Sequence, residues 1–486
     1  MQKKYLAAAV AALCSTAAFA APVATLDPTN AAFVAPDAAH TIYIAGASAQ
    51  QNPLETVLKT AGEVFVSLAN VTKISASIGG SFAYLGTSVI DNKPMAVIYN
   101  GTNGSAAGIN QLLSKGTGEP ESTVVKLTSG ATNGCTALVA SGSISTTTCS
   151  QTGPRETDMA LSDVYAAEFG SSGSLCSGPL TPYAAPICIN AAYLTVGDIK
   201  SPIAAASTGL EGFGVIVNDK AYNTLLAKNV AEGILPASCA GATVTRGVAN
   251  PANAGICQPS LRKADYAVLA TNNSGWDSFA LDNVGGTPVQ IHRRDEFSGT
   301  QAASNIFFLN NVCGDSGHFG KMVPARAADS GVAPNAPTVT WFEQPGTGNV
   351  ESGVAAAGTG VIAMGVVSTN RADHADSSSK NWWFVKLDGI SPNYLPNGTL
   401  DSTKRVTLLD GSYTFATEMA AYVRNTIASD NAVAAAVTTK IASALASSDV
   451  TPTGLNGIAY LDKPLSYPDG VQAKFSRAGN NCAPLH

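Results

Sequence analysis

The sequence predicts an α/β fold with largely parallel sheets. Three short apolar segments are typical of strands, and each runs through small residues into a segment with helical spacing: residues 41–58, 95–109 and 288–307. Strands that alternate with helices indicate parallel sheets, in which the strands end beside the helix starts. In such sheets ligands bind beyond the carboxyl ends of the strands. We therefore expect the functional residues at these handover turns.

The first handover turn contains Ser48 and Ala49. It follows a strand predicted at 41–45, and the helix after it places apolar residues on one face: Leu54, Val57, Leu58, Ala61 and Phe65. The first backbone N–H groups of a helix have no partner inside the helix, so they and the Ser48 hydroxyl could bind an anion. The alternative is that Ser48 is an ordinary helix N-cap.

Two further turns belong to the N-terminal part of the chain. A strand predicted at 95–99 leads to Ser105, just before a helix that begins at Ala106. A short strand at 158–163 ends in Asp163, whose carboxylate could face a ligand at the same edge. N-capping is the alternative for both residues, with Asp163 capping a helix over 164–168.

The richest turn is the one that follows the strand predicted at 288–292. Arg294 precedes Ser298, Gly299 and Thr300, and a helix with Ala303, Ile306 and Phe307 follows. Gly299 allows a ligand to approach the backbone, the hydroxyls donate hydrogen bonds, and the Arg294 guanidinium suits a tetrahedral oxyanion. Alternatively, Ser298 is a simple N-cap and Arg294 pairs with Asp295 or Glu296.

Composition indicates an exported protein. Residues 1–20 have the basic start, the apolar run and the Ala-Phe-Ala end of a secretory signal. Charged residues make up only 13% of the chain and the net charge is −6, which argues against a nucleic-acid partner. After the signal, no run is long and apolar enough to predict a membrane span; the segment 353–367 is short and broken by glycines. We expect a periplasmic or secreted location.

Eight cysteines follow the signal, and an even number in an exported chain predicts disulfides. Sequence proximity favours the pairs 135–149, 176–188 and 239–257, which leaves 313 with 482. Scattered histidines and the lack of a Cys-x-x-Cys motif argue against a zinc site. Four of these cysteines lie in Ser/Thr/Gly-rich stretches, 114–156 and 170–190, which we interpret as surface insertions held by local disulfides.

The ordered set of turns resembles the periplasmic phosphate-binding proteins of ABC transporters, which have the type II solute-binding fold. The family's first Gly-Ala-x-Ala turn is similar to residues 45–49, and its Gly-Ser motif to 104–109. Its Asp-Phe-Gly-Ala-Ser-Asp strand is similar to 158–163, and its Arg-x-Asp-Gly-Ser-Gly-Thr loop to 294–300. The resemblance spans roughly residues 40–430, although Ala49 stands where the family has phenylalanine.

This resemblance implies a fold of two lobes with a ligand cleft between them. Lobe one would be 40–212 plus 363–486, lobe two would be 213–362, and segments near 213–218 and 360–367 would form the hinge. The expected function is the capture of phosphate for ABC-type uptake or scavenging, by a monomer with no enzyme activity and no cofactor and with an ABC permease as possible partner. Asp163 would accept the proton of hydrogen phosphate and exclude sulfate.

Two alternatives from other classes stay open. The Ser/Thr-rich insertions would also suit a secreted or surface interaction protein built on a binding-protein fold. Ser298, His292 and Asp295 contain the residue types of a serine hydrolase. However, strand alternation places His292 and Arg293 on opposite faces, and no Gly-x-Ser-x-Gly elbow surrounds Ser298.

Overall fold

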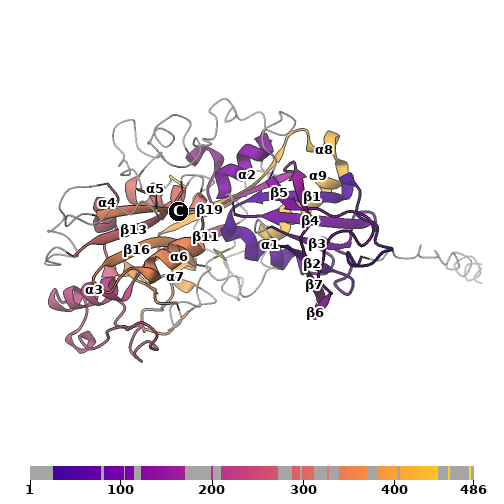
Figure 1. Cartoon of the computed structure of the whole chain (residues 1–486). Helices are drawn as coiled ribbons and strands as arrows, with labels where there is room; N and C mark the ends of the chain where they lie inside the picture. Colours follow the sequence, from indigo (N-terminus) through magenta and orange to yellow (C-terminus); the bar gives the residue numbers. More distant parts are fainter. Residues whose placement is uncertain are drawn as a thin grey trace, which may run out of the picture.

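The structure is a computed structural model that describes residues 26–77, 81–102, 104–113, 122–169, 199–200, 209–271, 287–295, 298–310, 326–327, 339–369, 380–401, 405–446, 458–459 and 481–482. Within these residues the chain is mixed α/β, as the sequence predicts (Figure 1). Its main sheet has 16 described strands in the order β14-β15-β13-β16-β11-β19-β9-β1-β4-β3-β2-β7-β6, with β10, β17 and β20 off this path. The predicted signal, the insertion 170–190 and the cysteines 176, 188 and 313 lie outside the described residues.

Three parallel strands form the centre of what we call the first half of the sheet. β1 (Thr41–Gly46) lies between β4 (Pro94–Asn100) and β9 (Met159–Ser162). Helices cover these strands, which explains their continuous apolar sequences. The helices are α1 (Gln51–Leu58), α2 (Gly104–Leu113) and α9 (Ala432–Ala446). The three predicted strands are thereby confirmed, with boundaries shifted by one residue.

The first predicted helix is shorter than its apolar spacing suggested. α1 ends at Leu58, and the Lys59 N–H closes it by bonding back to the carbonyls of Glu55, Thr56 and Val57. Ala61 and Phe65 therefore lie beyond the helix, and Phe65 forms an isolated bridge with Ser88 instead. The prediction was wrong there because Phe65 is buried through a turn, with Gly62 in the left-handed region (φ 86°), rather than through a continued helix.

The second half of the sheet repeats this plan. β13 (Val289–Arg294) lies between β15 (Val339–Gln344) and β16 (Ile362–Ser368), all parallel. The accompanying helices are α3 (Asp219–Ala231), α4 (Lys263–Thr271), α5 (Gly299–Leu309) and α6 (Thr347–Ala356). In both halves the first strand of the chain is central, flanked by the second and the third. The strand and helix predicted around Ser298 are confirmed.

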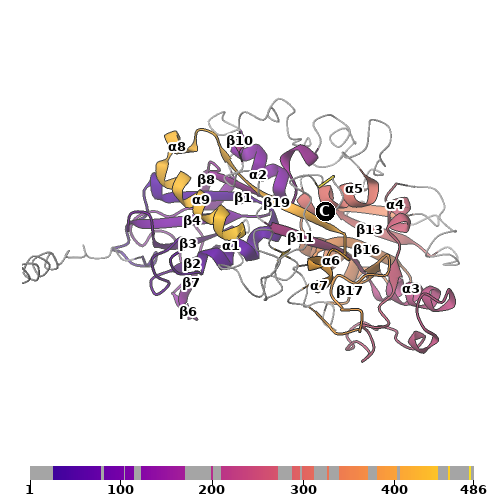
Figure 2. The same cartoon turned by 180° about the vertical axis from the view of Figure 1, so that it is seen from behind.

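Two long strands join the halves. β11 (Gly209–Val217) pairs through its first four residues with β19 and through its last five with β16, antiparallel in both cases. β19 (Ala416–Arg424) pairs with β11 at its start and with β9 further along. A short strand lies antiparallel to each: β17 (Trp383–Phe384) beside β11, and β10 (Ile199–Lys200) beside β19. Figure 2 shows both long strands in the middle of the molecule.

The predicted insertion 114–156 adds strands to the sheet as well as surface loops. Its strand β7 (Ile144–Cys149) pairs in parallel with β2 (Thr72–Ala76), which pairs with β3 (Phe82–Thr87). The other elements are short: β5 (Ser122–Val125), β6 (Val139–Ser141), β8 (Thr152–Arg155), β12 (Ser260–Leu261), β14 (Arg326–Ala327), β18 (Lys386–Leu387), β20 (Ile458–Ala459), α7 (Val406–Leu409) and α8 (Ile427–Asp430).

Two of the predicted disulfides are confirmed, Cys135–Cys149 and Cys239–Cys257. Cys482 is also disulfide-bonded. None of the helices within the described ranges has the length and the apolar character that a membrane span requires.

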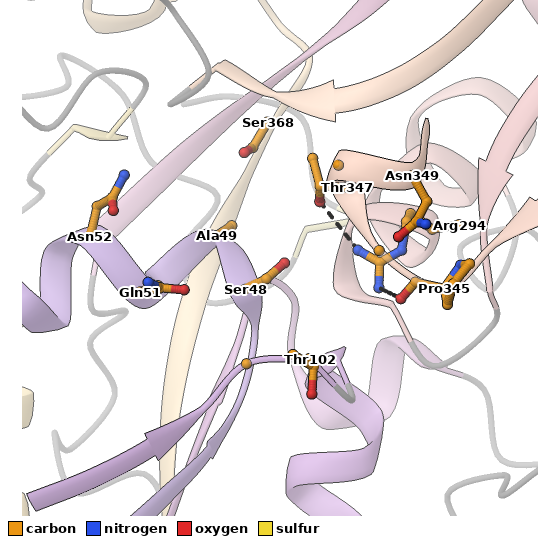
Figure 3. A pocket seen from close by; sticks show the side chains of 13 residues that line it. Ser48, Ala49, Gln51, Asn52, Thr102, Arg294, Pro345, Thr347, Asn349 and Ser368 are labelled. Carbon is orange, nitrogen blue, oxygen red and sulfur yellow. Dashed lines mark hydrogen bonds between the residues drawn. The ribbon is translucent and has the colours of Figure 1, made fainter. Parts of the chain in front are cut away.

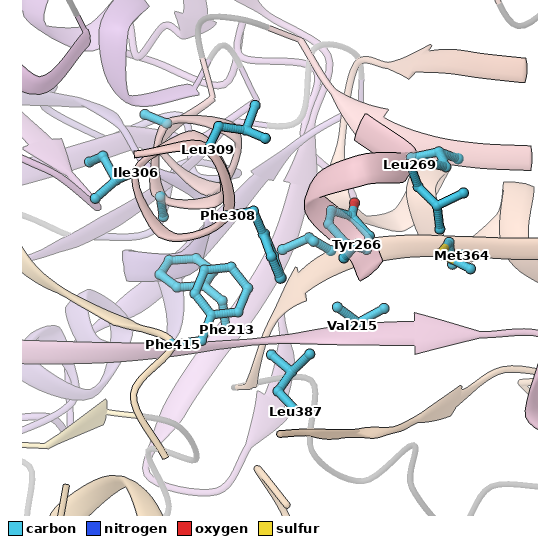
Figure 4. Close-up of a cluster of buried hydrophobic side chains, with 14 of the residues drawn as sticks. Phe213, Val215, Tyr266, Leu269, Ile306, Phe308, Leu309, Met364, Leu387 and Phe415 are labelled. Atoms are coloured by element: carbon cyan, nitrogen blue, oxygen red, sulfur yellow. The ribbon is translucent and has the colours of Figure 1, made fainter. Parts of the chain in front are cut away.

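The largest buried apolar cluster runs through the middle of the sheet. It joins α2 and β9 of the first half to α4, α5 and β13 of the second. At the junction, Phe213 of β11 and Phe415 pack with ring centroids 5.6 Å apart, and Phe307 of α5 stacks on Phe415 at 4.4 Å. Figure 4 shows Phe213, Phe415 and Phe308 gathered beneath α5. The aromatic contacts therefore lie where β11 enters the second half and where β19 begins.

A buried carboxylate ties α1 to the sheet. Glu55 accepts hydrogen bonds from Lys73 Nζ (2.7 Å), the Tyr84 hydroxyl (2.7 Å) and Lys59 Nζ (3.0 Å). Although burial alone would raise its pKa, the hydrogen bonds from Lys73, Tyr84 and Lys59 lower the pKa of Glu55 to about 2. Glu55 is therefore ionised at neutral pH, and its charge is matched by its neighbours.

We expect Glu55→Gln to lower the free energy of unfolding by about 1–3 kcal/mol, because the amide replaces a charged acceptor of buried donors. Because the pKa of Glu55 is depressed from 4.5 to about 2, its stabilisation is present above pH 4.5 and is lost as the pH falls through 2. Urea unfolding between pH 3 and pH 7 measures this. Glu232→Gln, in the exposed Lys228–Glu232 pair, is the control and should cost less than about 0.5 kcal/mol. Equal losses in the two variants would contradict the interpretation.

Candidate functional site

A pocket of about 360 Å³ opens where the parallel strands of both halves end. Its walls come from the turns after β1, β4, β13 and β15, together with the end of β16 (Figure 3). The lining residues are Ser48, Ala49, Gln51, Asn52, Gly101, Thr102, Arg294, Pro345, Gly346, Thr347, Gly348, Asn349 and Ser368. The pocket therefore lies where an α/β sheet is expected to bind its ligand.

The first half contributes a wall of small and neutral polar residues. Ser48 begins a 3₁₀ turn (Ser48–Gln50) that runs directly into α1, and no side chain caps this turn. Ala49 lies beside it and is buried. On the neighbouring turn, Thr102 is held by Asn100, whose side-chain oxygen accepts from the Thr102 amide (3.0 Å) and hydroxyl (2.7 Å). Ser48 and Ala49 thus line the pocket, and their contact with a ligand stays a prediction.

Arg294, at the end of β13, is the one charged residue among the described residues that line the pocket. It is only 3% exposed. Its Nε donates to the Gln344 carbonyl (3.3 Å), Nη1 to the Thr347 hydroxyl (3.2 Å), and Nη2 to Asp295 (3.3 Å) and to the Pro345 carbonyl (3.1 Å). A guanidinium has five N–H donors, so one hydrogen of Nη1 has no partner within the described residues.

These contacts revise the expected role of Arg294. The ion pair with Asp295 that the sequence left as an alternative does form. The guanidinium therefore offers a ligand one charged N–H and its positive charge, rather than a two-pronged fork. Its remaining bonds hold the turn 344–347, which begins α6. Glu296 lies outside the described residues.

A ligand-facing turn at 344–347, at the start of α6, was not predicted from the sequence. Gly346 is the N-cap of the helix and provides no side-chain cap, so the first N–H groups of α6 are open to a ligand. Because the Thr347 hydroxyl accepts from Arg294, its own hydrogen is left to donate elsewhere. The signal was present, since Pro-Gly-Thr-Gly follows a strand at 339–344, but the glycines obscured the helix behind it.

Three other predicted residues lie outside the pocket and touch one another. An ideal Cβ built on Gly299, the first residue of α5, would lie 2.4 Å from Ser105 Oγ and 2.7 Å from Asp163 Oδ2. The Ser105 hydroxyl accepts a hydrogen bond from the Asp163 amide (3.2 Å). The start of α5, in the second half, therefore packs directly on residues of the first half, with no room between them for an anion in this arrangement.

Ser298 and Thr300 are both buried at the same helix start. Ser298 occupies the N-cap position of α5, but its side chain makes no capping hydrogen bond. The proposed capping by Asp163 is not found either: the turn after it is a 3₁₀ turn at Ala166–Phe169, and the Tyr165 amide bonds to Glu168 (2.8 Å).

His292 lies on the face of β13 that α6 covers. A Cβ on Gly353 of α6 would come within 2.2 Å of His292 Nδ1. Its ring nitrogens contact Gln344 (3.0 Å) and Gln290 (3.4 Å). Burial lowers the pKa of His292 to about 4, so the ring is neutral at pH 7. These contacts give no support to a triad of His292 with Ser298 and Asp295.

Two buried carboxyl groups lie behind the pocket wall. Asp163 and Glu211 are 2% and 0% exposed, and neither Asp163 Oδ1 nor either Glu211 carboxyl oxygen has a hydrogen-bond partner of normal geometry in the described part of the chain. Burial raises the pKa of Asp163 to about 7, against the opposing effects of Arg294 and of Glu211 as a donor. Burial and the nearby Asp163 raise the pKa of Glu211 well above its usual value, while Ser368 opposes this. The pair therefore retains a proton at neutral pH.

Metal chemistry has no support among the described residues, where no group of three or more His, Cys, Asp or Glu side chains could hold an ion. Comparison with known proteins identifies no relative either: the chain matches no protein-family model, and no curated protein matches it in sequence. The proposals below therefore rest on the geometry of the pocket and on the residues around it.

The buried acid pair predicts an unusual dependence of stability on pH. Unfolded Asp163 ionises near 3.8 and the folded residue near 7, so the free energy of unfolding should fall as the pH rises between these values. Asp163→Asn cannot ionise and should lose the part of this dependence that comes from Asp163, while burial still raises the pKa of Glu211. The free energy of unfolding of Asp163→Asn should rise relative to that of wild type by on the order of 2–4 kcal/mol between pH 4 and pH 8, at 1.36 kcal/mol per pKa unit.

Urea unfolding of both proteins across that range measures the difference, and the exposed Asp410, as Asp410→Asn, is the matched control. Parallel stability curves for wild type and Asp163→Asn would show that the carboxyl ionises normally in the folded protein. The other charged and titratable groups that act on the pair, Arg294 and Tyr99, remain in place in these variants.

Proposed function

We propose that this chain is an exported binding protein that captures a phosphate-type oxyanion in the pocket beside Arg294. The observation that carries the proposal is the convergence of one buried arginine with uncapped helix starts from both halves of the sheet. Helix starts favour anions through their free N–H groups and aligned peptide dipoles. A single positive charge among neutral donors is a suitable environment for a small anion.

The two-lobed type II arrangement is part of this proposal. Support comes from the repeated strand order, because in each half a central strand lies between two parallel neighbours, and a long antiparallel strand and then a short one follow. Lobe one would be built on 40–212 and lobe two would begin at 213, where β11 changes partner from β19 to β16. We take β11 as one connection, since it pairs with β19 and then with β16, and β19 as the other, since it leads from β11 to β9. Among the described strands, β16, in the predicted hinge segment 360–367, pairs with β13 and β11.

In this arrangement, ligand binding would stabilise the closed form. Ser48 and Ala49 belong to the first half, whereas Arg294 and Thr347 belong to the second. A ligand that contacts both walls at once has contacts in the closed form that the open form lacks, and it shifts the population accordingly. Asp163 lies behind Gly299 rather than at the pocket, so the expected discrimination against sulfate is not carried into the proposal.

The disulfides support an oxidising, extracytoplasmic compartment. Delivery to an ABC permease would complete the transport role that the sequence resemblance implies. A binding protein with no transporter is the other outcome, and the affinity for the anion is the first quantity to measure.

We expect Arg294→Ala to weaken binding of inorganic phosphate by at least about 30-fold, since loss of a buried charged contact costs roughly 2–5 kcal/mol. Isothermal titration calorimetry of the ligand-stripped protein measures this. Lys220→Ala, which removes a positive charge on α3 away from the pocket, is the control and should bind as wild type does.

Because Arg294 also holds the turn 344–347, a second variant separates binding from folding. Thr347→Val removes one acceptor of Arg294 and keeps its bonds to the Gln344 and Pro345 carbonyls, so it should weaken phosphate by several-fold and lower the melting temperature less than Arg294→Ala does. Wild-type protein that binds neither phosphate nor sulfate would overturn the proposed function, as would an Arg294→Ala variant within threefold of wild type.

A further inference from the structure

The pocket has donors at one end and an acceptor at the other. Figure 3 shows Arg294, Thr347 and Asn349 at one end, Gln51 and Asn52 at the opposite end, and Ser48 between them. The Arg294 end offers a charged N–H, the Thr347 hydroxyl hydrogen and the first N–H groups of α6. All of these favour an anionic group.

At the opposite end, the orientation of Gln51 is fixed by a neighbour. Its Nε2 donates to Glu55 Oε1 (3.1 Å), four residues along α1. A carboxylate can only accept, so the NH₂ group of Gln51 must face Glu55, and this assigns the positions of the Gln51 Nε2 and Oε1 atoms. The amide oxygen is then the atom turned along the pocket towards Ser48 (Figure 3).

This orientation is held by the buried network described above. Glu55 is anchored by Lys59, Lys73 and Tyr84, and it is ionised at neutral pH. Gln51 therefore presents an acceptor that cannot turn over without losing a bond to a charged group. An acceptor at this position matches a ligand hydroxyl and would repel a second anionic group.

The size of the pocket points the same way. A volume of about 360 Å³ lies at the lower end of the range of roughly 300–1,000 Å³ for pockets that hold organic ligands. A free phosphate ion has only five non-hydrogen atoms. If it bound at Arg294, it would leave the Gln51 end filled with water.

We propose that the pocket holds a phosphate monoester whose short hydroxylated tail donates a hydrogen bond to the Gln51 side chain. This inference rests on the proposed function, because the phosphoryl group would occupy the oxyanion site beside Arg294. Gln51 is then the residue that makes the pocket bind a monoester more tightly than free phosphate. Glu55 is a positioning residue that acts by orienting Gln51.

Calorimetry with three probes tests the inference: inorganic phosphate, glycerol 3-phosphate and glycerol. We expect glycerol 3-phosphate to bind wild type about tenfold more tightly than phosphate, the worth of one well-formed hydrogen bond, and glycerol not to bind. Gln51→Leu should bring the ratio of the glycerol 3-phosphate affinity to the phosphate affinity close to one. Gln151→Leu, the same change in the insertion far along the chain, should keep the preference.

Glu55→Gln gives a readout that loss of stability alone would not produce. The amide introduced at position 55 can either donate or accept, so it no longer fixes the orientation of Gln51. The ratio of the two affinities should then fall towards one while phosphate still binds. Phosphate bound as tightly as glycerol 3-phosphate by wild type would overturn the inference and leave the proposed function standing. If wild type binds neither phosphate nor glycerol 3-phosphate, both the inference and the proposed function are wrong. If Gln51→Leu still prefers glycerol 3-phosphate, Gln51 is not the residue that binds the tail.

Discussion

The antiparallel pairing of β11 with β19 is the contact on which the rest of the sheet depends. Four residue pairs, from Gly209 with Met419 to Gly212 with Ala416, join strands that continue in opposite directions into different halves. Each strand then pairs with a strand of one half: β11 pairs with β16 of the second half, and β19 pairs with β9 of the first. Every residue of β11 and all but the last of β19 are buried, so a slip of one residue here would exchange the side chains that face the two sides of the sheet.

The aromatic cluster at this crossing provides the packing that holds the register. Phe213 lies where β11 passes from β19 to β16, Phe415 directly precedes β19, and Phe307 of α5 stacks on Phe415. The same crossing carries a cost, since Glu211 of β11 is fully buried with Asp163 beside it. Two carboxyl groups in dry surroundings are tolerated only if they hold a proton, and the positive charge of Arg294 lies close enough to act on Asp163.

The sequence predicted those strands and helices whose formation depends on residues close together in the chain. The strands at 41–46 and 94–100 are buried apolar runs and the strand at 289–294 begins with β-branched residues; the turn after the first strand and the end of the last bring Ser48 and Arg294 to one pocket. The end of α1 was missed because Phe65 has the right spacing for a helix but is buried through a turn. The segment 353–367 contains the end of α6 and most of β16, and two of the glycines that interrupt it in the sequence, Gly358 and Gly360, lie between these elements.

Other features depend on contacts between distant parts of the chain, and no local pattern carries them. Glu211 and Asp163 are 48 residues apart in the sequence and come together because β11 and β9 both pair with β19. The partners of Arg294 lie some 50 residues further along, at the start of α6. For this reason the sequence indicated a fork open to the ligand, whereas four of its five N–H donors are used within the protein.

Gly299 has a consequence for which residues the chain can accept. Its backbone is not among those in the left-handed region, so an ordinary helix residue could adopt its conformation. What excludes a side chain is the opposite half: even one methyl group would overlap Ser105 and Asp163. A glycine is thus required by the clearance between two surfaces rather than by the path of the chain, and that clearance sets how closely the start of α5 can approach the first half.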